Sequence, residues 1–271
     1  MSKSPSSFNS SALVFAGLDP TGGAGISADI ETFSNLNVHA LPIITCLTVQ
    51  DTRNVKHLQS VDIQLLQQQL ETLLQDISFQ VIKLGLLSSI EIIDLVANTI
   101  KSQSNIPVIF DPILKAGGGA NLSNTTVDTI IKSMRENIIP HTTLMTPNSL
   151  EARLLTGKEE LNDCAKELSN LGCQHILITG EHENDPEQIT NTLYTSDNKG
   201  CLTHTTYQWP RLPHQYHGSG CTLASAISAY MASGLTTNDA VQQAQQFTHS
   251  SLQQAIQLGQ GQYHPNRFID D

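Results

Sequence analysis

Short apolar runs alternate with amphipathic stretches along most of this chain. Residues 13–16 are apolar without interruption, which is typical of a buried strand, and a glycine-rich loop follows over 17–25. A helix is then predicted over 26–37. Farther along, apolar residues recur at helical spacing over 63–77 and predict a second helix whose apolar face packs on a core.

The same alternation continues toward the C-terminus and determines the expected fold class. Strands that alternate with helices at this spacing build a mostly parallel sheet covered on both faces, so we predict an α/β fold. Such sheets bind ligands at the carboxyl ends of their strands. An antiparallel pair is predicted over 191–194 and 202–206. The other predicted strands are 41–49, 81–84, 107–110, 142–145 and 176–179, and the other predicted helices are 89–101, 127–134, 149–155, 164–171, 219–233 and 238–257.

Composition excludes several classes of partner. The 271 residues carry a formal net charge of −11 with only 14 Lys and Arg, which argues against a nucleic-acid partner because such binding needs clustered basic side chains. The longest uncharged apolar stretch contains Pro42 and is about half the roughly 20 residues of a spanning helix, so no membrane partner is expected. Residues 1–11 are serine-rich without an apolar signal region. They are expected to form a disordered lead-in before one domain over 12–271.

The five cysteines are odd in number, widely spaced and never arranged as C-x-x-C. This pattern indicates neither a disulfide framework nor a zinc site, and it favours a reducing, cytoplasmic location. The scarcity of basic residues also constrains any phosphate site. Such a site would depend on backbone N–H groups, helix N-termini and a metal ion.

A glycine-rich turn at residues 217–222 leads into a predicted core-facing helix. Unpaired N–H groups and the helix dipole favour an anion there, so Gly218, Ser219 and Gly220 are candidates for an anion hole. Cys221 lies in the first turn, where the dipole lowers a thiol pKa and favours a thiolate base or nucleophile. The alternative is a plain glycine turn beside a small buried cysteine.

The opening loop contains a literal G-x-G-x-x-A match at Gly23, Gly25 and Ala28. In a dinucleotide-binding fingerprint the first glycine follows the strand directly and an acidic residue stands about 20 positions on, and neither condition holds here. A dinucleotide-dependent oxidoreductase is therefore a secondary hypothesis. Asp29 is either an exposed residue that complements the helix dipole or a ligand-binding carboxylate.

Hard oxygen ligands follow other predicted strands. Asn148 and Glu151 form either a capping box or a pair that holds waters of a magnesium ion. Asp111 is a second metal candidate. Gln50 either reads a heteroaromatic ring with its donor and acceptor or is simply solvated. The chain has no P-loop, protein-kinase or zinc-protease motif.

Together and in this order, these motifs resemble those of the hydroxymethylpyrimidine and phosphomethylpyrimidine kinases of thiamine biosynthesis. The resemblance runs from about Leu13 to Ser250 and implies a ribokinase-like three-layer α/β/α sandwich, frequently a homodimer. It implies ATP-dependent phosphorylation of 4-amino-5-hydroxymethyl-2-methylpyrimidine and then of its monophosphate. The matching residues are Ala16–Gly25, Ala28-Asp29, Gln50, Lys83–Gly85, Asp111-Pro112, Thr146–Asn148 with Glu151, and His217–Thr222.

The resemblance also implies roles for particular residues. A pyrimidine pocket is expected from Gly17, Asp29 and Gln50, lined by Thr48, Leu86 and Ile113. Nucleotide contacts are expected from Asn148, Thr179, Gly180 and Gly220, and magnesium contacts from Glu151 and Asp111. Cys221 matches a base that faces the hydroxymethyl group, beside the anion hole of Gly218, Ser219 and Gly220. The implied cofactors are ATP and Mg²⁺, and a monovalent-cation requirement is left open.

Three positions depart from the family pattern. Thr179 stands where many relatives have a lysine near the nucleotide, Leu86 replaces a frequent methionine of similar volume, and Asp51 replaces a frequent asparagine. The nearest alternative function is pyridoxal or pyridoxine kinase, because some pyridoxal-acting relatives also carry a cysteine at the position of Cys221. The missing lysine keeps open a non-catalytic ligand-binding protein.

Overall fold

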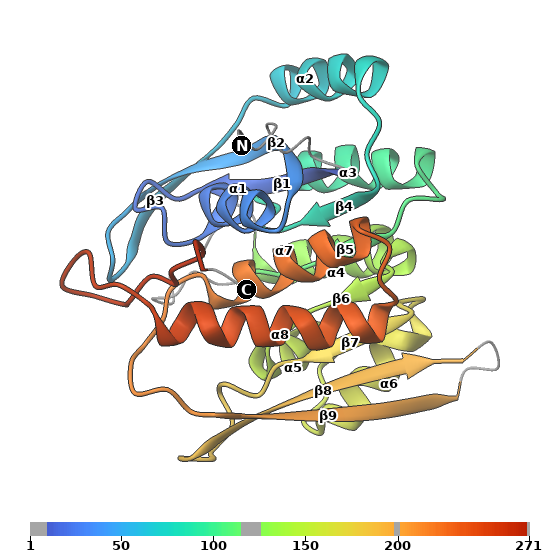
Figure 1. The fold of residues 1–271 in the computed structure, drawn as a ribbon. Coiled ribbons are helices and arrows are strands. Elements are labelled where there is room, and N and C mark those ends of the chain that lie inside the picture. The colour runs from blue at the N-terminus through green and yellow to red at the C-terminus, as the bar shows by residue number, and fades with distance from the viewer. Residues whose placement is uncertain (1–9, 115–125, 198–200, 270–271) are drawn as a thin grey trace, which may run out of the picture.

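The computed structural model of the protein describes residues 10–114, 126–197 and 201–269. Within these residues one nine-stranded sheet has the order β3-β2-β1-β4-β5-β6-β7-β8-β9 (Figure 1). Pairing is parallel from β2 through β7, whereas β3 at one edge and β8 and β9 at the other are antiparallel. The strands are β1 (Ser10–Leu18), β2 (Val38–Gln50), β3 (Val55–Ser60), β4 (Val81–Leu84), β5 (Val108–Phe110), β6 (Leu144–Met145), β7 (His175–Ile178), β8 (Gln188–Ser196) and β9 (Leu202–Pro210).

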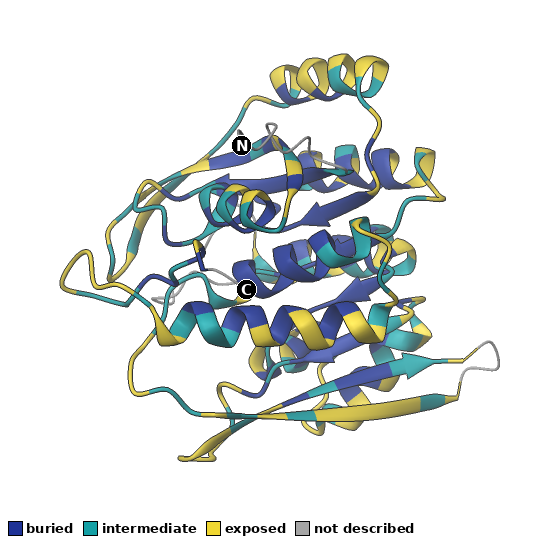
Figure 2. Cartoon of the chain, in the orientation of Figure 1, coloured by how far each residue is buried: buried dark blue, intermediate teal, exposed yellow. Residues whose placement is uncertain are grey.

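Helices cover both faces of the sheet and create two hydrophobic cores. Along β1, Leu13 and Phe15 pack into one core while Val14 and Ala16 pack into the other, as expected for a strand whose side chains alternate between faces. Figure 2 shows the central strands buried between the two helical layers. One layer contains α1 (Gly25–Asn35), α7 (Ser219–Ala232) and α8 (Thr237–Gln253). The other contains α2 (Ile63–Asp76), α3 (Ile90–Ser102), α4 (Val127–Asn137), α5 (Ser149–Thr156) and α6 (Leu161–Asn170), and the short 3₁₀ helix η1 (Ile139–His141) follows α4.

The predicted mostly parallel sheet between two helical layers is confirmed, and so is the antiparallel pair β8 and β9. Strand β3 was not predicted, because its sequence VKHLQS is largely polar and none of its residues is buried. Ser10 and Ser11 belong to β1, so the expected lead-in over 1–11 is wrong at its last two residues, while residues 1–9 lie outside the described part. In the described residues, no helix has the length and apolar character needed to cross a membrane.

Candidate active site

A cavity of about 1150 Å³ lies where the parallel strands end and α7 begins. Pockets for one small molecule typically measure roughly 300–1,000 Å³, so this cavity has room for a nucleotide together with a small second substrate. Most residues that the sequence predicts for the site line it. They are Gly17, Thr48, Gln50, Leu86, Asp111, Ile113, Asn148, Glu151, Thr179, Gly218, Ser219, Gly220 and Cys221.

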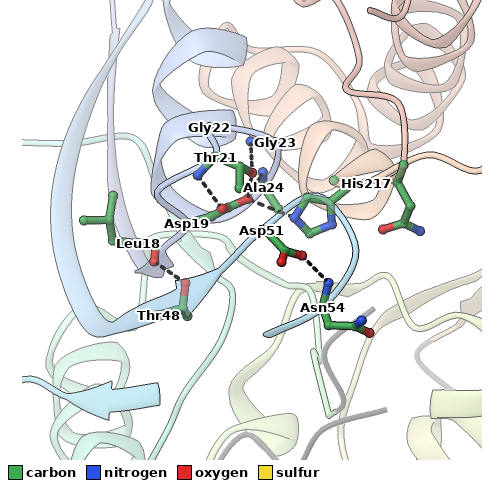
Figure 3. Close-up of polar contacts among 12 residues, drawn as sticks. Leu18, Asp19, Thr21, Gly22, Gly23, Ala24, Thr48, Asp51, Asn54 and His217 are labelled. Atoms are coloured by element: carbon green, nitrogen blue, oxygen red, sulfur yellow. Dashed lines mark hydrogen bonds and ion pairs between the residues drawn. The ribbon is translucent and has the colours of Figure 1, made fainter. Parts of the chain in front are cut away.

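The opening loop is held by the carboxylate of Asp19 (Figure 3). Its Oδ1 accepts the backbone N–H of Thr21 at 2.8 Å, and its Oδ2 accepts the backbone N–H of Ala24 at 3.0 Å. The Nε2 atom of His217 donates to the same Oδ2 at 2.8 Å. Burial raises the pKa of Asp19, but the hydrogen bonds from His217, Gln50 and Thr21 outweigh burial and leave this pKa well below its usual value. The opening loop is thereby fastened to the residue that precedes the glycine turn.

The glycine turn packs its backbone directly against the opening loop. Gly218 has φ of +84° and is the N-cap of α7, and a side chain at this position would overlap the carbonyl oxygen of Gly23. The hydroxyl of Thr222 donates to the carbonyl of Gly218 at 2.8 Å. The first residues of α7, Ser219 and Gly220, line the cavity at the helix N-terminus, where N–H groups favour an anion.

The expected lowering of the Cys221 pKa is wrong. The side chain lies in the cavity wall but is almost fully buried, and burial raises the pKa of this thiol to about 12. The charge of Lys83 acts in the opposite direction, while Asp111 adds to the increase. Desolvation therefore dominates at this helix terminus, and the thiol is protonated at neutral pH.

Asp29 forms a buried ion pair beneath the site. Its two carboxylate oxygens accept bonds from Lys83 Nζ at 2.8 and 2.9 Å, and Oδ1 also accepts the hydroxyl of Ser225 at 2.6 Å. Both charged side chains have no exposed surface. Burial lowers the pKa of Lys83, but Asp29 more than compensates, so the lysine stays charged. Asp29 is neither exposed nor among the cavity-lining residues, contrary to both expectations, whereas Lys83 does line the cavity.

Two carboxylates line the cavity: Asp111, which follows β5 and is buried, and Glu151 of α5, which is partly buried. Asn148 Oδ1 accepts the N–H of Glu151 at 2.9 Å and the Glu151 carboxylate accepts the N–H of Asn148 at 3.0 Å, which confirms the capping box. Burial, and then the charge of Asp111, raises the pKa of Glu151 to about 8. Burial likewise raises the pKa of Asp111 to about 6, and its Oδ2 is buried without a hydrogen-bond partner. These hard oxygens destabilise each other as anions, so the donor set fits a hard cation such as Mg²⁺.

A polar network supports the cavity wall beyond Thr179. The N–H of Gly180 donates to Asn191 Oδ1 at 3.1 Å. Gly180 is not among the residues that line the cavity, and it supports the wall through Asn191, which does line it. Asn191 Nδ2 and Trp209 Nε1 both donate to Gln245 Oε1, at 2.8 and 3.1 Å. Asn191, Trp209 and Gln245 line the cavity, and sequence reasoning missed them because they come from separate elements without a local motif.

Comparison with known proteins places this chain in a known group of enzymes. The model of the phosphomethylpyrimidine kinase family matches residues 19–266. This chain belongs to the phosphomethylpyrimidine kinase family. It is 33% identical over 262 residues to the hydroxymethylpyrimidine/phosphomethylpyrimidine kinase of Bacillus subtilis (strain 168), covering 95% of this chain and 94% of that protein. It is 31% identical over 257 residues to the pyridoxine kinase of the same strain, covering 92% of each chain.

The fold of the family agrees with the observed architecture. The structure of the pyridoxal kinase from Staphylococcus aureus in complex with AMP-PCP and pyridoxal superposes with a TM-score of 0.84 at 25% identity, covering 96% of this chain and 93% of that chain. The ribokinase-like fold expected from the sequence is therefore confirmed. The protein is a kinase, and this membership sets aside the oxidoreductase and non-catalytic alternatives.

Proposed function

We propose that this kinase transfers the γ-phosphoryl group of ATP to 4-amino-5-hydroxymethyl-2-methylpyrimidine and then to its monophosphate, in thiamine biosynthesis. The observation that carries this proposal is that one cavity gathers the strand-end residues and the Gly218–Cys221 turn in a member of this family. Its volume of about 1150 Å³ accommodates an alcohol and a nucleotide at once.

In this proposal the pyrimidine ring lies at the ends of β1 and β2. The side chain of Gln50 already bonds to Asp19, and its remaining amide donor and carbonyl acceptor are offered to the ring. Leu86 and Ile113 supply apolar walls. Thr48 shapes this end of the cavity, because its hydroxyl is already bonded to the carbonyl of Leu18 at 2.9 Å. The ring is thus recognised by one amide and by shape.

The phosphoryl group would be stabilised by backbone groups and a cation. Gly218, Ser219 and Gly220 line the cavity at the N-terminus of α7, and their backbone N–H groups would bind the anionic phosphoryl group. Glu151 would hold Mg²⁺, whose charge would offset that of the transferring group when bound, while Asp111 would accept the relayed proton. Asn148 and Thr179 would contact the nucleotide. Because Thr179 carries no charge, the metal and the backbone N–H groups must offset most of the negative charge of the phosphates.

Cys221 would face the hydroxymethyl oxygen as a relay for its proton. The thiol is protonated in the free protein, and a hydrogen bond from Cys221 lowers the pKa of Asp111, which burial otherwise raises. As the oxygen attacks the phosphorus atom, the alcohol proton passes to the sulfur and the thiol proton passes to Asp111. A hydroxyl at this position can perform the same exchange, whereas a methyl group cannot.

Pyridoxal or pyridoxine phosphorylation is the second candidate, because the 31% identical relative is a pyridoxine kinase. The test is to measure kcat/KM with Mg-ATP for the pyrimidine alcohol, its monophosphate and pyridoxal. We expect both pyrimidines to exceed pyridoxal by about tenfold or more, the discrimination that one or two pocket contacts provide. Higher kcat/KM for pyridoxal would transfer the assignment to the second candidate.

Assembly and location are also part of this proposal. Leu47 and Val49 on β2 are 45% and 56% exposed beside the edge strand β3, and we propose that a second copy covers them in a homodimer. A cytoplasmic location is proposed from the five cysteines, all of which are free. Light scattering of the protein and of Val49→Lys tests the dimer, since the charge should weaken association.

A further inference from the structure

Arg267 lies in the segment after α8 and is the largest fully buried side chain of the described residues. Its Nε donates to the hydroxyl of Thr222 at 2.9 Å, and its Nη1 donates to Glu31 at 2.9 Å and to the carbonyl of Gly22 at 3.4 Å. Its Nη2 makes a short hydrogen bond to the carbonyl of Gly23. The residue lies one position beyond the stretch that the family model matches.

These bonds join two parts of the candidate active site. Gly22 and Gly23 belong to the opening loop, and Thr222 belongs to the first turn of α7. Thr222 in turn donates to the carbonyl of Gly218, whose Cα packs against the Gly23 carbonyl too closely to admit a side chain. The guanidinium therefore connects the two backbone segments that meet at the anion hole.

Other contacts of the C-terminal segment support the same reading. The N–H of His217 donates to the carbonyl of Tyr263 at 2.9 Å, and the N–H of Tyr263 donates to the carbonyl of Gln215 at 2.8 Å. The N–H of Gln262 donates to the carbonyl of Thr52 at 2.9 Å, just after the end of β2. The segment thus runs along three loops at the cavity mouth.

We propose that Arg267 is a positioning residue that holds the opening loop in register with the Gly218 turn during phosphoryl transfer. Glu31 balances its charge, so its contribution is geometric. Loss of the guanidinium would leave the buried carbonyl of Gly23 and the partly buried carbonyl of Gly22 without these bonds and let the loop shift relative to the anion hole. A displacement of about 1 Å costs roughly 10²-fold in turnover.

The kinetic test, which rests on the proposed function, compares Arg267→Ala with Arg135→Ala. Arg135 is the matched control because it also joins a carbonyl to a carboxylate, those of Leu155 and Glu167, away from the cavity. We expect Arg267→Ala to lower kcat about 100-fold while the KM for ATP changes less than about threefold. Added guanidinium should raise kcat at least about tenfold in Arg267→Ala and not in Arg135→Ala. Arg267→Lys should not restore kcat, because an ammonium group lacks the planar set of donors of a guanidinium.

Hydrogen exchange supplies a readout that needs no turnover. In Arg267→Ala, amides of residues 22–25 and 218–222 should exchange faster together, while those of α3 stay unchanged. If Arg267→Ala does not fold, Thr222→Val, which removes only the shared hydroxyl, should show the same two changes in smaller measure.

The outcomes separate the inference from the proposed function. Unchanged kcat in a folded Arg267→Ala protein, or exchange confined to one loop, would overturn the positioning role. Wild-type protein without kinase activity on any alcohol would remove the proposed function, and exchange alone would then decide whether Arg267 couples the loops.

Discussion

Removing one member of the buried pair of Asp29 and Lys83 should strongly destabilise the fold beneath the site. Asp29→Leu removes a carboxylate that accepts two bonds from Lys83 and one from Ser225, and it leaves a fully buried ammonium without its partner. Removing one member of such a pair costs about 3–5 kcal/mol, a large share of the roughly 5–15 kcal/mol that stabilises a typical domain. Replacing both members by apolar side chains of similar size is often neutral.

Urea unfolding of a mutant cycle measures this effect. Asp29→Leu and Lys83→Met should each lower the free energy of unfolding by about 3 kcal/mol or more, and the double variant should recover at least about 2 kcal/mol relative to either one. Asp163→Asn, in an exposed pair with Lys166, is the control and should change it by less than about 1 kcal/mol. If Asp29→Leu leaves stability unchanged but raises the KM for the pyrimidine, Asp29 contacts substrate and the structural assignment fails.

Three further changes test the turn and the loop. Cys221→Ala should lower kcat by about 10²-fold or more while ATP still quenches the fluorescence of Trp209, and Cys221→Ser should retain more activity; equal loss in both variants would contradict the relay. Gly218→Ala should lower kcat by about 10²-fold, because its methyl group meets the Gly23 carbonyl; normal kcat would show that the turn adapts. Because folding lowers the pKa of Asp19, its carboxylate stabilises the fold at any pH above the ordinary aspartate pKa of about 4. This contribution to stability is lost as the pH falls below that value. The stability gap between wild type and Asp19→Asn should therefore be full at about pH 6 and shrink toward about pH 3, whereas a constant gap would exclude Asp19 as its source.

The sheet was predictable because its central strands are buried on both faces and read as apolar runs. Strand β3 escaped prediction because it is an edge strand whose side chains face water, so its sequence carries no apolar period. The end of α8 was placed four residues too late, at 257, because residues 254–257 contain no glycine or proline that would signal the end of a helix.

The geometry of the candidate site was predictable where it depends on local backbone, as in the glycine turn at the N-terminus of α7. Side-chain ionisation was not predictable, because it depends on burial by distant elements: the helix dipole suggested a low pKa for Cys221, and desolvation reverses it. Contacts between segments far apart in the sequence could not be predicted from the sequence either. The bond from Arg267 to Gly23 joins residues 244 positions apart, and no local pattern announces it.

The central claim is phosphoryl transfer to a pyrimidine alcohol at the Gly218–Cys221 turn. Its most direct test is ³¹P NMR of the protein with Mg-ATP and the pyrimidine monophosphate as the sole acceptor. The proposed function predicts that the monophosphate resonance is replaced by two coupled resonances of a diphosphate as ADP accumulates, with no such change in Cys221→Ala on the same time scale. An unchanged monophosphate resonance, with ATP intact or merely hydrolysed, would contradict it.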